Sequence, residues 1–279
     1  MTGTLYLVST PIGNINDISI RAIDVLNAVD IILTEDTRVT TKLLKYHSVT
    51  TKESLQSFNQ INEDKKAPDI ISELKEGKDV ALVSDAGTPL ISDPGYKFIR
   101  HARENSIKVE PVPGCCALIA AITASGLPSD RFSFYGFLPR TTSKRIKELK
   151  KLSNKEETLI FYESVHRIQS SIEDMMKIFG GNRPAVLCKE ITKIHESFIG
   201  ETLSEITTFI ESNQDKVKGE FTVIVQGSST SEESNDNLDK VLRMLMLDLS
   251  LKKTVEIVSK LTKISKSKIY EQALKIKKQ

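Results

Sequence analysis

The sequence is poor in cysteine and has no long hydrophobic run. Its three cysteines are an odd number, and two of them, Cys115 and Cys116, are adjacent, which fits neither a disulfide framework nor the paired spacing of a zinc site. No apolar run approaches the roughly 18 residues that span a bilayer, and the N-terminus lacks the basic and then apolar signature of a signal peptide. We therefore expect a cytoplasmic protein with no membrane partner.

Several motifs of nucleotide and metal sites are also missing. There is no Walker A pattern, no paired-histidine zinc motif and no Gly-x-Ser-x-Gly elbow. The loop after the first predicted strand, residues 9–14, contains only Gly13, whereas a dinucleotide-binding unit has several closely spaced glycines there. Glu35 and Asp36 follow the second predicted strand, where an acidic residue suits a ribose ligand, but that assignment needs the missing glycines. We predict no metal site.

Short apolar runs alternate with segments of helical periodicity through the first 227 residues. The first predicted strands, which we expect to be buried on both faces, are 5–9, 30–34, 80–84 and 109–112, with helices at 18–29 and 94–104. A second set has a helix at 116–125 and strands at 131–137, 158–162, 185–189, 196–199 and 221–225. Such alternation is typical of a parallel sheet covered by helices. The sequence predicts two tandem α/β domains, residues 1–113 and 114–227, a division that suits 279 residues.

The C-terminal region differs sharply in composition. Residues 228–239 contain almost no apolar side chain, and we interpret them as a linker. Residues 240–279 carry a charge of about +8, which leaves about −6 on the rest of the chain. We predict a helix to about Leu261, a break at residues 263–264 and a second helix capped by Ser265, the outline of a helix-turn-helix module.

Two interpretations of this basic module stay open. It contacts RNA, or it is a solvated hairpin that docks through its apolar side chains on the body or on a second subunit. The side chains proposed for docking are Val255, Val258, Leu261, Ile269 and Leu274.

The most informative stretch, residues 83–95, reads VSDAGTPLISDPG. A predicted strand ends at Ser84, small residues let the backbone turn, and Pro94 is suited to the first turn of the next helix. Ligands bind at the carboxyl ends of strands in open α/β sheets. The alternative is an ordinary strand-to-helix connection, in which Asp85 caps backbone amides instead of binding a ligand.

Two polar segments follow predicted strands of the second domain: FYESVHR at 161–167 and CKEITKIHE at 188–196. Polar groups just past buried strands suit substrate contact or proton transfer. Taken singly, each has a simpler structural explanation. Glu163 suits a helix N-terminus, and Lys189 with Glu190 suits an exposed ion pair that contributes little. Together the segments indicate a shared cleft.

These motifs, with STPIGNINDIS, EDTR and PGCCALIAAITASGLPSDRFSFYGFLPR, resemble the ribosomal RNA small-subunit methyltransferase I family, of the tetrapyrrole methylase fold. The resemblance implies two α/β domains with S-adenosylmethionine between them, a homodimer, and methylation of the ribose 2′-oxygen of a 16S ribosomal RNA cytidine near the decoding centre. It implies cofactor contacts from Pro11, Asp85, Ala86, Gly87, Thr88, Cys116, Ala117, Tyr162, Glu190 and Phe221. Catalysis is expected from Lys189, Glu190, Glu163, His166 and Arg167. Val165 departs from the proline expected in FYES-x-HR.

The chemistry needs mainly alignment of the 2′-oxygen and help in losing its proton, and no metal. Glu190, Glu163 and His166 are all possible bases, and Lys189 would stabilise an alkoxide. Two other functions are weighed: a tetrapyrrole methyltransferase, which would carry a glycine-rich first loop, and a non-enzymatic RNA-binding protein, which leaves the polar loops of both α/β domains unexplained.

Overall fold

The computed structural model describes residues 2–228, 238, 241–262 and 265–277. Its strands are β1 (Thr4–Val8), β2 (Ile31–Thr34), β3 (Gln56–Ser57), β4 (Val80–Val83), β5 (Lys108–Val112), β6 (Phe132–Phe137), β7 (Thr158–Ser164), β8 (Ala185–Lys189), β9 (Ser197–Ile199) and β10 (Glu220–Val225). Its helices are α1 (Ile20–Ala28), α2 (Thr37–Tyr46), α3 (Glu63–Lys75), α4 (Tyr96–Glu104), α5 (Ala117–Ala124), α6 (Thr142–Leu152), α7 (Ile168–Phe179), α8 (Leu203–Ser212), η1 (Gln214–Lys216), α10 (Leu251–Thr262) and α11 (Lys266–Lys277). Residues 241–248 are also helical. None of the described helices is long and apolar enough to cross a membrane.

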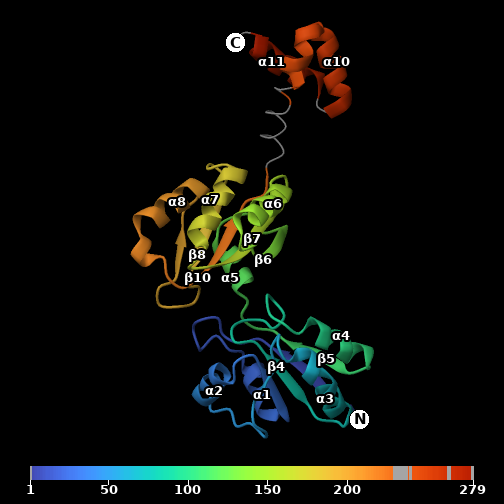
Figure 1. Ribbon diagram of the computed structural model, residues 1–279, viewed down its shortest axis with the longest axis vertical. Helices are drawn as coiled ribbons and strands as arrows, with labels where there is room; N and C mark the ends of the chain where they lie inside the picture. Colours follow the sequence, from blue (N-terminus) through green and yellow to red (C-terminus); the bar gives the residue numbers. More distant parts are fainter. Residues whose placement is uncertain (1, 229–237, 239–240, 263–264, 278–279) are drawn as a thin grey trace. The chain divides into compact units, whose positions relative to one another are not determined.

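The first sheet is parallel, with strand order β3-β2-β4-β1-β5. Figure 1 shows β4 and β5 of this sheet together with helices α1 to α4. Helices α1 and α2 pack on one face, and α3 and α4 pack on the other. The central strands β2 and β4 are buried along their whole length, as their continuous apolar runs predict. The expectation of full burial is wrong for β5, because it is an edge strand and leaves Lys108 and Pro111 exposed, and it is wrong in part for β1, where Tyr6 and Leu7 are only half-buried.

Local sequence explains where the helices of this sheet begin. Ser19 caps α1 by accepting a hydrogen bond from the amide of Ala22, and Asp36 caps α2 through the amide of Arg38. The prediction that Pro94 lies in the first turn of a helix is wrong. Gly95, at φ +122°, is the N-cap of α4, so Pro94 precedes the helix. The left-handed backbone of Gly95 turns the chain between the loop after β4 and helix α4.

The second sheet has strand order β6-β7-β10-β8-β9. The expectation of a parallel sheet is wrong here, because only the β6–β7 pair is parallel and the other three pairs are antiparallel. Helix α5 packs with the core on one face, while α7 and α8 contact β7 and β8. Between α6 and α7, Arg145 and Asp174 form an ion pair at 2.6 Å, with side chains 2% and 3% exposed. The prediction of two α/β sheets in series is confirmed, and the two sheets belong to one compact unit of the chain.

The C-terminal helices form a second compact unit with a core of their own. The two predicted helices and the small all-helical module are confirmed, while the helix at 241–248 was not predicted. The docking interpretation is wrong for Val255, Val258 and Ile269, because these side chains are buried in the module's own core, and Leu261 is 74% exposed. The predicted linker, apart from residues 228 and 238, and the predicted break at 263–264 lie outside the described residues.

Candidate functional site

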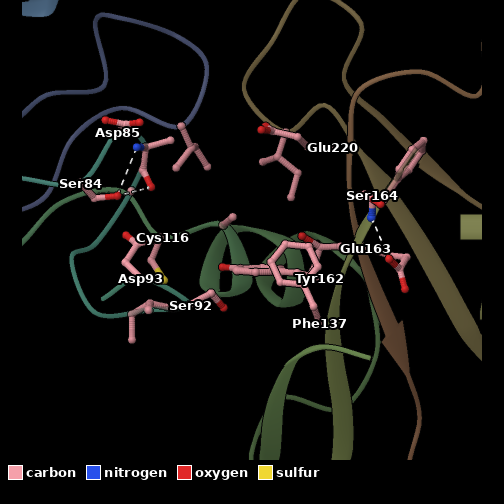
Figure 2. Close-up of a pocket in the computed structure, with 18 of the residues that line it drawn as sticks. Ser84, Asp85, Ser92, Asp93, Cys116, Phe137, Tyr162, Glu163, Ser164 and Glu220 are labelled. Atoms are coloured by element: carbon pink, nitrogen blue, oxygen red, sulfur yellow. Dashed lines mark hydrogen bonds between the residues drawn. The ribbon is translucent and has the colours of Figure 1, made fainter. Parts of the chain in front are cut away.

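A cavity of about 420 Å³ is lined by loops of the first sheet and by β7, β10 and the start of α5 (Figure 2). Its volume is in the range of small-molecule sites. On the first sheet, the neighbouring strands β1 and β4 lead into helices on opposite faces, α1 and α4. Such a reversal opens a crevice at the carboxyl ends of the strands, where ligands of open α/β sheets bind. The loop after β4 lies there.

Hydrogen bonds hold this loop, residues 84–88, in a defined conformation. Thr10 and Gly87 exchange backbone hydrogen bonds, with N–O distances of 2.9 and 3.1 Å. The Thr10 hydroxyl donates to the carbonyl of Ser84, and the Thr88 hydroxyl donates to the carbonyl of Cys115. Gly87 has φ +87°, which glycine adopts without strain. The loops that follow β1 and β4 are therefore tied together.

Three carboxylates from the first sheet and its loops line the cavity: Glu35, Asp85 and Asp93. Figure 2 shows Asp85 and Asp93 on the same side of the cavity, and the charges of both act on Glu35. Burial, followed by the charges of Asp93 and Asp85, raises the pKa of Glu35 to about 7. Burial and the charge of Asp85 also raise the pKa of Asp93, against a hydrogen bond from Ser84. The buried Oδ2 atom of Asp93 has no hydrogen-bond partner among the described residues. This side of the cavity favours a cationic or hydrogen-bond-donating ligand.

Apolar and aromatic groups form the other side. Phe221 of β10 and Tyr162 of β7 line the cavity together with Cys116 and Ala117 at the start of α5. The Tyr162 hydroxyl accepts a hydrogen bond from the amide of Leu118 at 3.1 Å, which ties the second sheet to the first turn of α5. Burial raises the pKa of Tyr162 well above its usual value, so this side chain stays neutral.

Glu163 also lines the cavity, but both oxygens of its carboxylate accept hydrogen bonds from neighbouring residues. One oxygen accepts from the Ser164 amide, and the other accepts from the Ser171 hydroxyl at 2.7 Å and from Arg167 at 3.1 Å. Arg167 also donates to the carbonyl of Leu138. The side chain of Glu163 is 1% exposed. Glu163 and Arg167 thus join β7, α7 and the segment after β6.

Glu190 lies just outside the lining, in a loop with φ +50° at this residue. Its Oε1 atom accepts hydrogen bonds from the Lys193 ammonium at 2.9 Å and the Glu220 amide at 3.0 Å. Burial raises the pKa of Glu190, but these two hydrogen bonds together with the positive charges of Lys193 and Lys189 leave the pKa below its usual value. Lys193 also pairs with the carboxylate of Glu220, and both Glu220 and Ile191 line the cavity.

The structure therefore gathers most of the residues singled out from the sequence, but not all. Those lining the cavity are Asp85, Ala86, Gly87, Thr88, Cys116, Ala117, Tyr162, Glu163 and Phe221. The residues that line the cavity in the described chain do not include Pro11, His166, Arg167, Lys189 or Glu190. Ile12 lines it in place of Pro11, His166 is exposed in the turn before α7, and Lys189 ends β8 opposite Phe221.

Several lining residues were not assigned from the sequence to this site, and the charged or aromatic ones among them are Glu35, Asp93, Phe137 and Glu220. Glu35 follows a buried strand, and Asp93 belongs to the 83–95 segment, so their positions carried a usable signal. Phe137 and Glu220 are positioned by strand pairing in the second sheet, and this pairing cannot be predicted from the sequence around either residue.

Comparison with known proteins adds family relationships. Residues 4–207 match the family described as tetrapyrrole (corrin/porphyrin) methylases, and residues 232–277 match the RsmI C-terminal HTH domain. The chain is 43% identical to ribosomal RNA small subunit methyltransferase I of Escherichia coli O157:H7, over 98% of this chain and 95% of that protein. It is 44% identical to the protein of that name from Vibrio cholerae serotype O1, over 97% and 94%. The solved structure of a cobalamin biosynthetic enzyme, cobalt precorrin-4 methyltransferase, matches 80% of this chain and 94% of that chain with TM-score 0.60 and 15% identity, which shows a shared fold.

Proposed function

The chain belongs to the ribosomal RNA small subunit methyltransferase I family, and we propose that it transfers a methyl group from S-adenosylmethionine to the 2′-oxygen of a cytidine in 16S ribosomal RNA, near the decoding centre. The observation that carries this proposal is the extent of the similarity. Relatives with that name align over 97–98% of the chain, so both sheets around the cavity and the basic C-terminal module are included.

The cavity suits S-adenosylmethionine, which supplies a methyl group on a cationic sulfonium when bound. The carboxylates of Glu35, Asp85 and Asp93 complement a cation, and the free Oδ2 atom of Asp93 offers an acceptor. Gly87 leaves room for a ligand to approach the backbone of the loop. We propose that the nine predicted lining residues, apart from Glu163, hold the cofactor directly, and that Pro11 acts through its neighbours Thr10 and Ile12.

The residues near β7 and β8 have different roles in this proposal. A ribose hydroxyl is a weak acid, so a base must take its proton as the methyl group is transferred. Both oxygens of Glu163 already accept hydrogen bonds, so we propose that Glu163 and Arg167 hold the cavity wall. Glu190 stays our proposed base at the rim, His166 is a further candidate, and Lys189 would stabilise the developing alkoxide. The pairing of Glu190 with Lys193 makes Glu190 a weaker base until the substrate displaces that contact.

We further propose that the basic C-terminal module recruits the RNA and that the protein acts as a homodimer. Lys252, Lys253, Lys260, Lys266 and Lys275 of the module are exposed. A polyanion is repelled by the net negative charge of residues 1–239 and attracted by these side chains.

The homodimer is tested by sedimentation at micromolar concentration, which should give twice the 31.1 kDa of one chain. A monomer alone would contradict the homodimer.

A methyl-transfer assay tests the function. Small ribosomal subunits from cells that lack this protein are incubated with the purified chain and methyl-labelled S-adenosylmethionine, and the RNA is digested to nucleosides. The proposal expects label in 2′-O-methylcytidine from one site. Label in a tetrapyrrole acceptor assayed in parallel, with none in RNA, would support the alternative substrate of the same fold. Cofactor binding without transfer to either acceptor would contradict both.

A further inference from the structure

Phe137, the last residue of β6, is an exposed aromatic side chain at the edge of the cavity. It is 54% exposed, and its ring centroid lies 5.9 Å from that of Tyr162. The preceding Gly136 approaches the loop after β4, because a Cβ atom there would lie 3.4 Å from the hydroxyl of Ser92. Figure 2 shows Phe137 beside Tyr162 on the second-sheet side of the cavity. An aromatic ring that is open to solvent at the edge of a ligand cavity offers a face on which a nucleic-acid base can stack.

The chain runs from Phe137 directly into a basic helix. Arg140 is exposed in the connection, and α6 begins two residues later. Lys144 and Lys147, in the first two turns of α6, are both exposed. They are three residues apart and so lie on the same side of the helix, about 4.5 Å apart along its axis.

The two lysines have no acidic partner among the described residues, whereas many other cations of residues 1–227 do. Arg145, between them, faces inward and is neutralised by Asp174. On the first sheet and its helices, ion pairs join Lys52 to Asp30, Lys78 to Glu53, Lys97 to Asp64, Arg100 to Glu104 and Lys108 to Glu110. Neither Lys144 nor Lys147 makes an ion pair with a described residue.

The net charge of the chain gives the position of Lys144 and Lys147 its significance. Residues 1–239 carry about −6, so an RNA strand is repelled on its way to the cavity unless cations lie near the mouth. A surface that combines an exposed aromatic ring with unpaired lysines fits a single-stranded nucleic acid, because bases stack on the ring and phosphates contact the cations.

We propose that Phe137, Lys144 and Lys147 form a binding surface for the RNA strand that carries the methyl acceptor. Phe137 stacks on a base at the mouth of the cavity, and the two lysines contact phosphates of the same strand. This inference rests on the proposed function and adds a second RNA-binding surface, on the α/β body, to the one proposed for the C-terminal module.

Binding of the full-length chain to small ribosomal subunits from cells that lack it, measured at several salt concentrations without S-adenosylmethionine, tests the lysines. Lys144→Ala/Lys147→Ala should weaken binding and make the slope of log affinity against log salt shallower by about 1.4, or about 0.7 for each lost phosphate contact. The matched control is Lys42→Ala/Lys45→Ala on α2, which removes two exposed, unpaired lysines with the same spacing. The control should keep the parent's slope.

Phe137 is tested by its aromatic character. Phe137→Ala should lower affinity for the subunits about 5- to 150-fold with the salt slope unchanged, because stacking releases no counterions. Phe137→Tyr keeps the ring and should stay within a few-fold of the parent. Melting temperatures of all variants show whether they are folded.

The outcomes separate this inference from the function on which it rests. A parent that binds and methylates the subunits, with an unchanged slope in the α6 variant or an equal change in the α2 control, overturns the lysine contacts and leaves the function standing. Equal losses in Phe137→Ala and Phe137→Tyr overturn the stacking. A parent that neither binds nor methylates the subunits overturns both the function and the inference.

Discussion

The substitution Gly87→Ala, which adds only a Cβ atom, tests whether S-adenosylmethionine binds against the loop of residues 84–88. The φ of Gly87, +87°, is a conformation that a residue with a Cβ atom adopts at a cost of about 1–2 kcal/mol. The added Cβ atom would also lie 3.2 Å from Cγ2 of Ile12, a flexible side chain that can move slightly. If the loop relaxes in Gly87→Ala and must be restored when the ligand binds, the affinity for S-adenosylmethionine should fall about 5- to 30-fold. Gly87→Val adds bulk and should bind more weakly still. Isothermal titration calorimetry measures both.

Gly180 provides the matched control. It has the same φ of +87° at the end of α7, lies outside the cavity, and a Cβ atom there would meet nothing within 4 Å. Gly180→Ala should therefore lower the melting temperature, by roughly 2–4 °C for each kcal/mol, and leave the affinity for S-adenosylmethionine unchanged. Equal affinity in the parent, Gly87→Ala and Gly87→Val would refute the placement of the cofactor against this loop.

Four other changes have defined expected outcomes. Because the carboxyl of Glu35 ionises near pH 7, calorimetry should show affinity for cationic S-adenosylmethionine rising between about pH 6 and about pH 8, and Glu35→Gln should flatten that rise; an unchanged pH profile would separate Glu35 from the ligand. Asp174→Ala leaves a buried arginine unpaired and should lower the free energy of unfolding by about 3–5 kcal/mol in urea titrations, whereas a loss under 1 kcal/mol would contradict the buried pair. Glu190→Gln should reduce turnover far more than cofactor affinity, and normal turnover would remove it as the base. Deleting residues 238–279 should weaken RNA binding and flatten its salt dependence while cofactor binding persists; a folded truncation with the parent's salt slope would exclude the module from RNA binding.

The sequence predicted those parts of the fold whose causes are local. The buried strands β2 and β4 are continuous apolar runs, and the loop after β4 is made of small residues, so both were visible as patterns. The edge position of β5 depends on strand order, which no single segment encodes. The helix at 241–248 adjoins the acidic, polar segment and was missed beside it.

The site was predictable to the same extent. Loops at the ends of strands were identified, but which side chains enter the cavity depends on partners far away in the sequence. Glu163 turns into the wall because Ser171 and Arg167 of the next segment reach it. Glu190 is held by the amide of Glu220, 30 residues further along the chain. Such pairings follow from the packing of the second sheet and cannot be deduced from residue type.

The most direct test of the central claim is mass spectrometry of small-subunit RNA from cells with and without this protein. Nuclease fragments of 16S ribosomal RNA are compared for a mass difference of one methyl group, and the modified nucleoside is then identified. The account predicts that one cytidine near the decoding centre loses a ribose 2′-O-methyl group when the protein is absent and regains it when the protein is restored. Identical methylation of the RNA in both strains would contradict it.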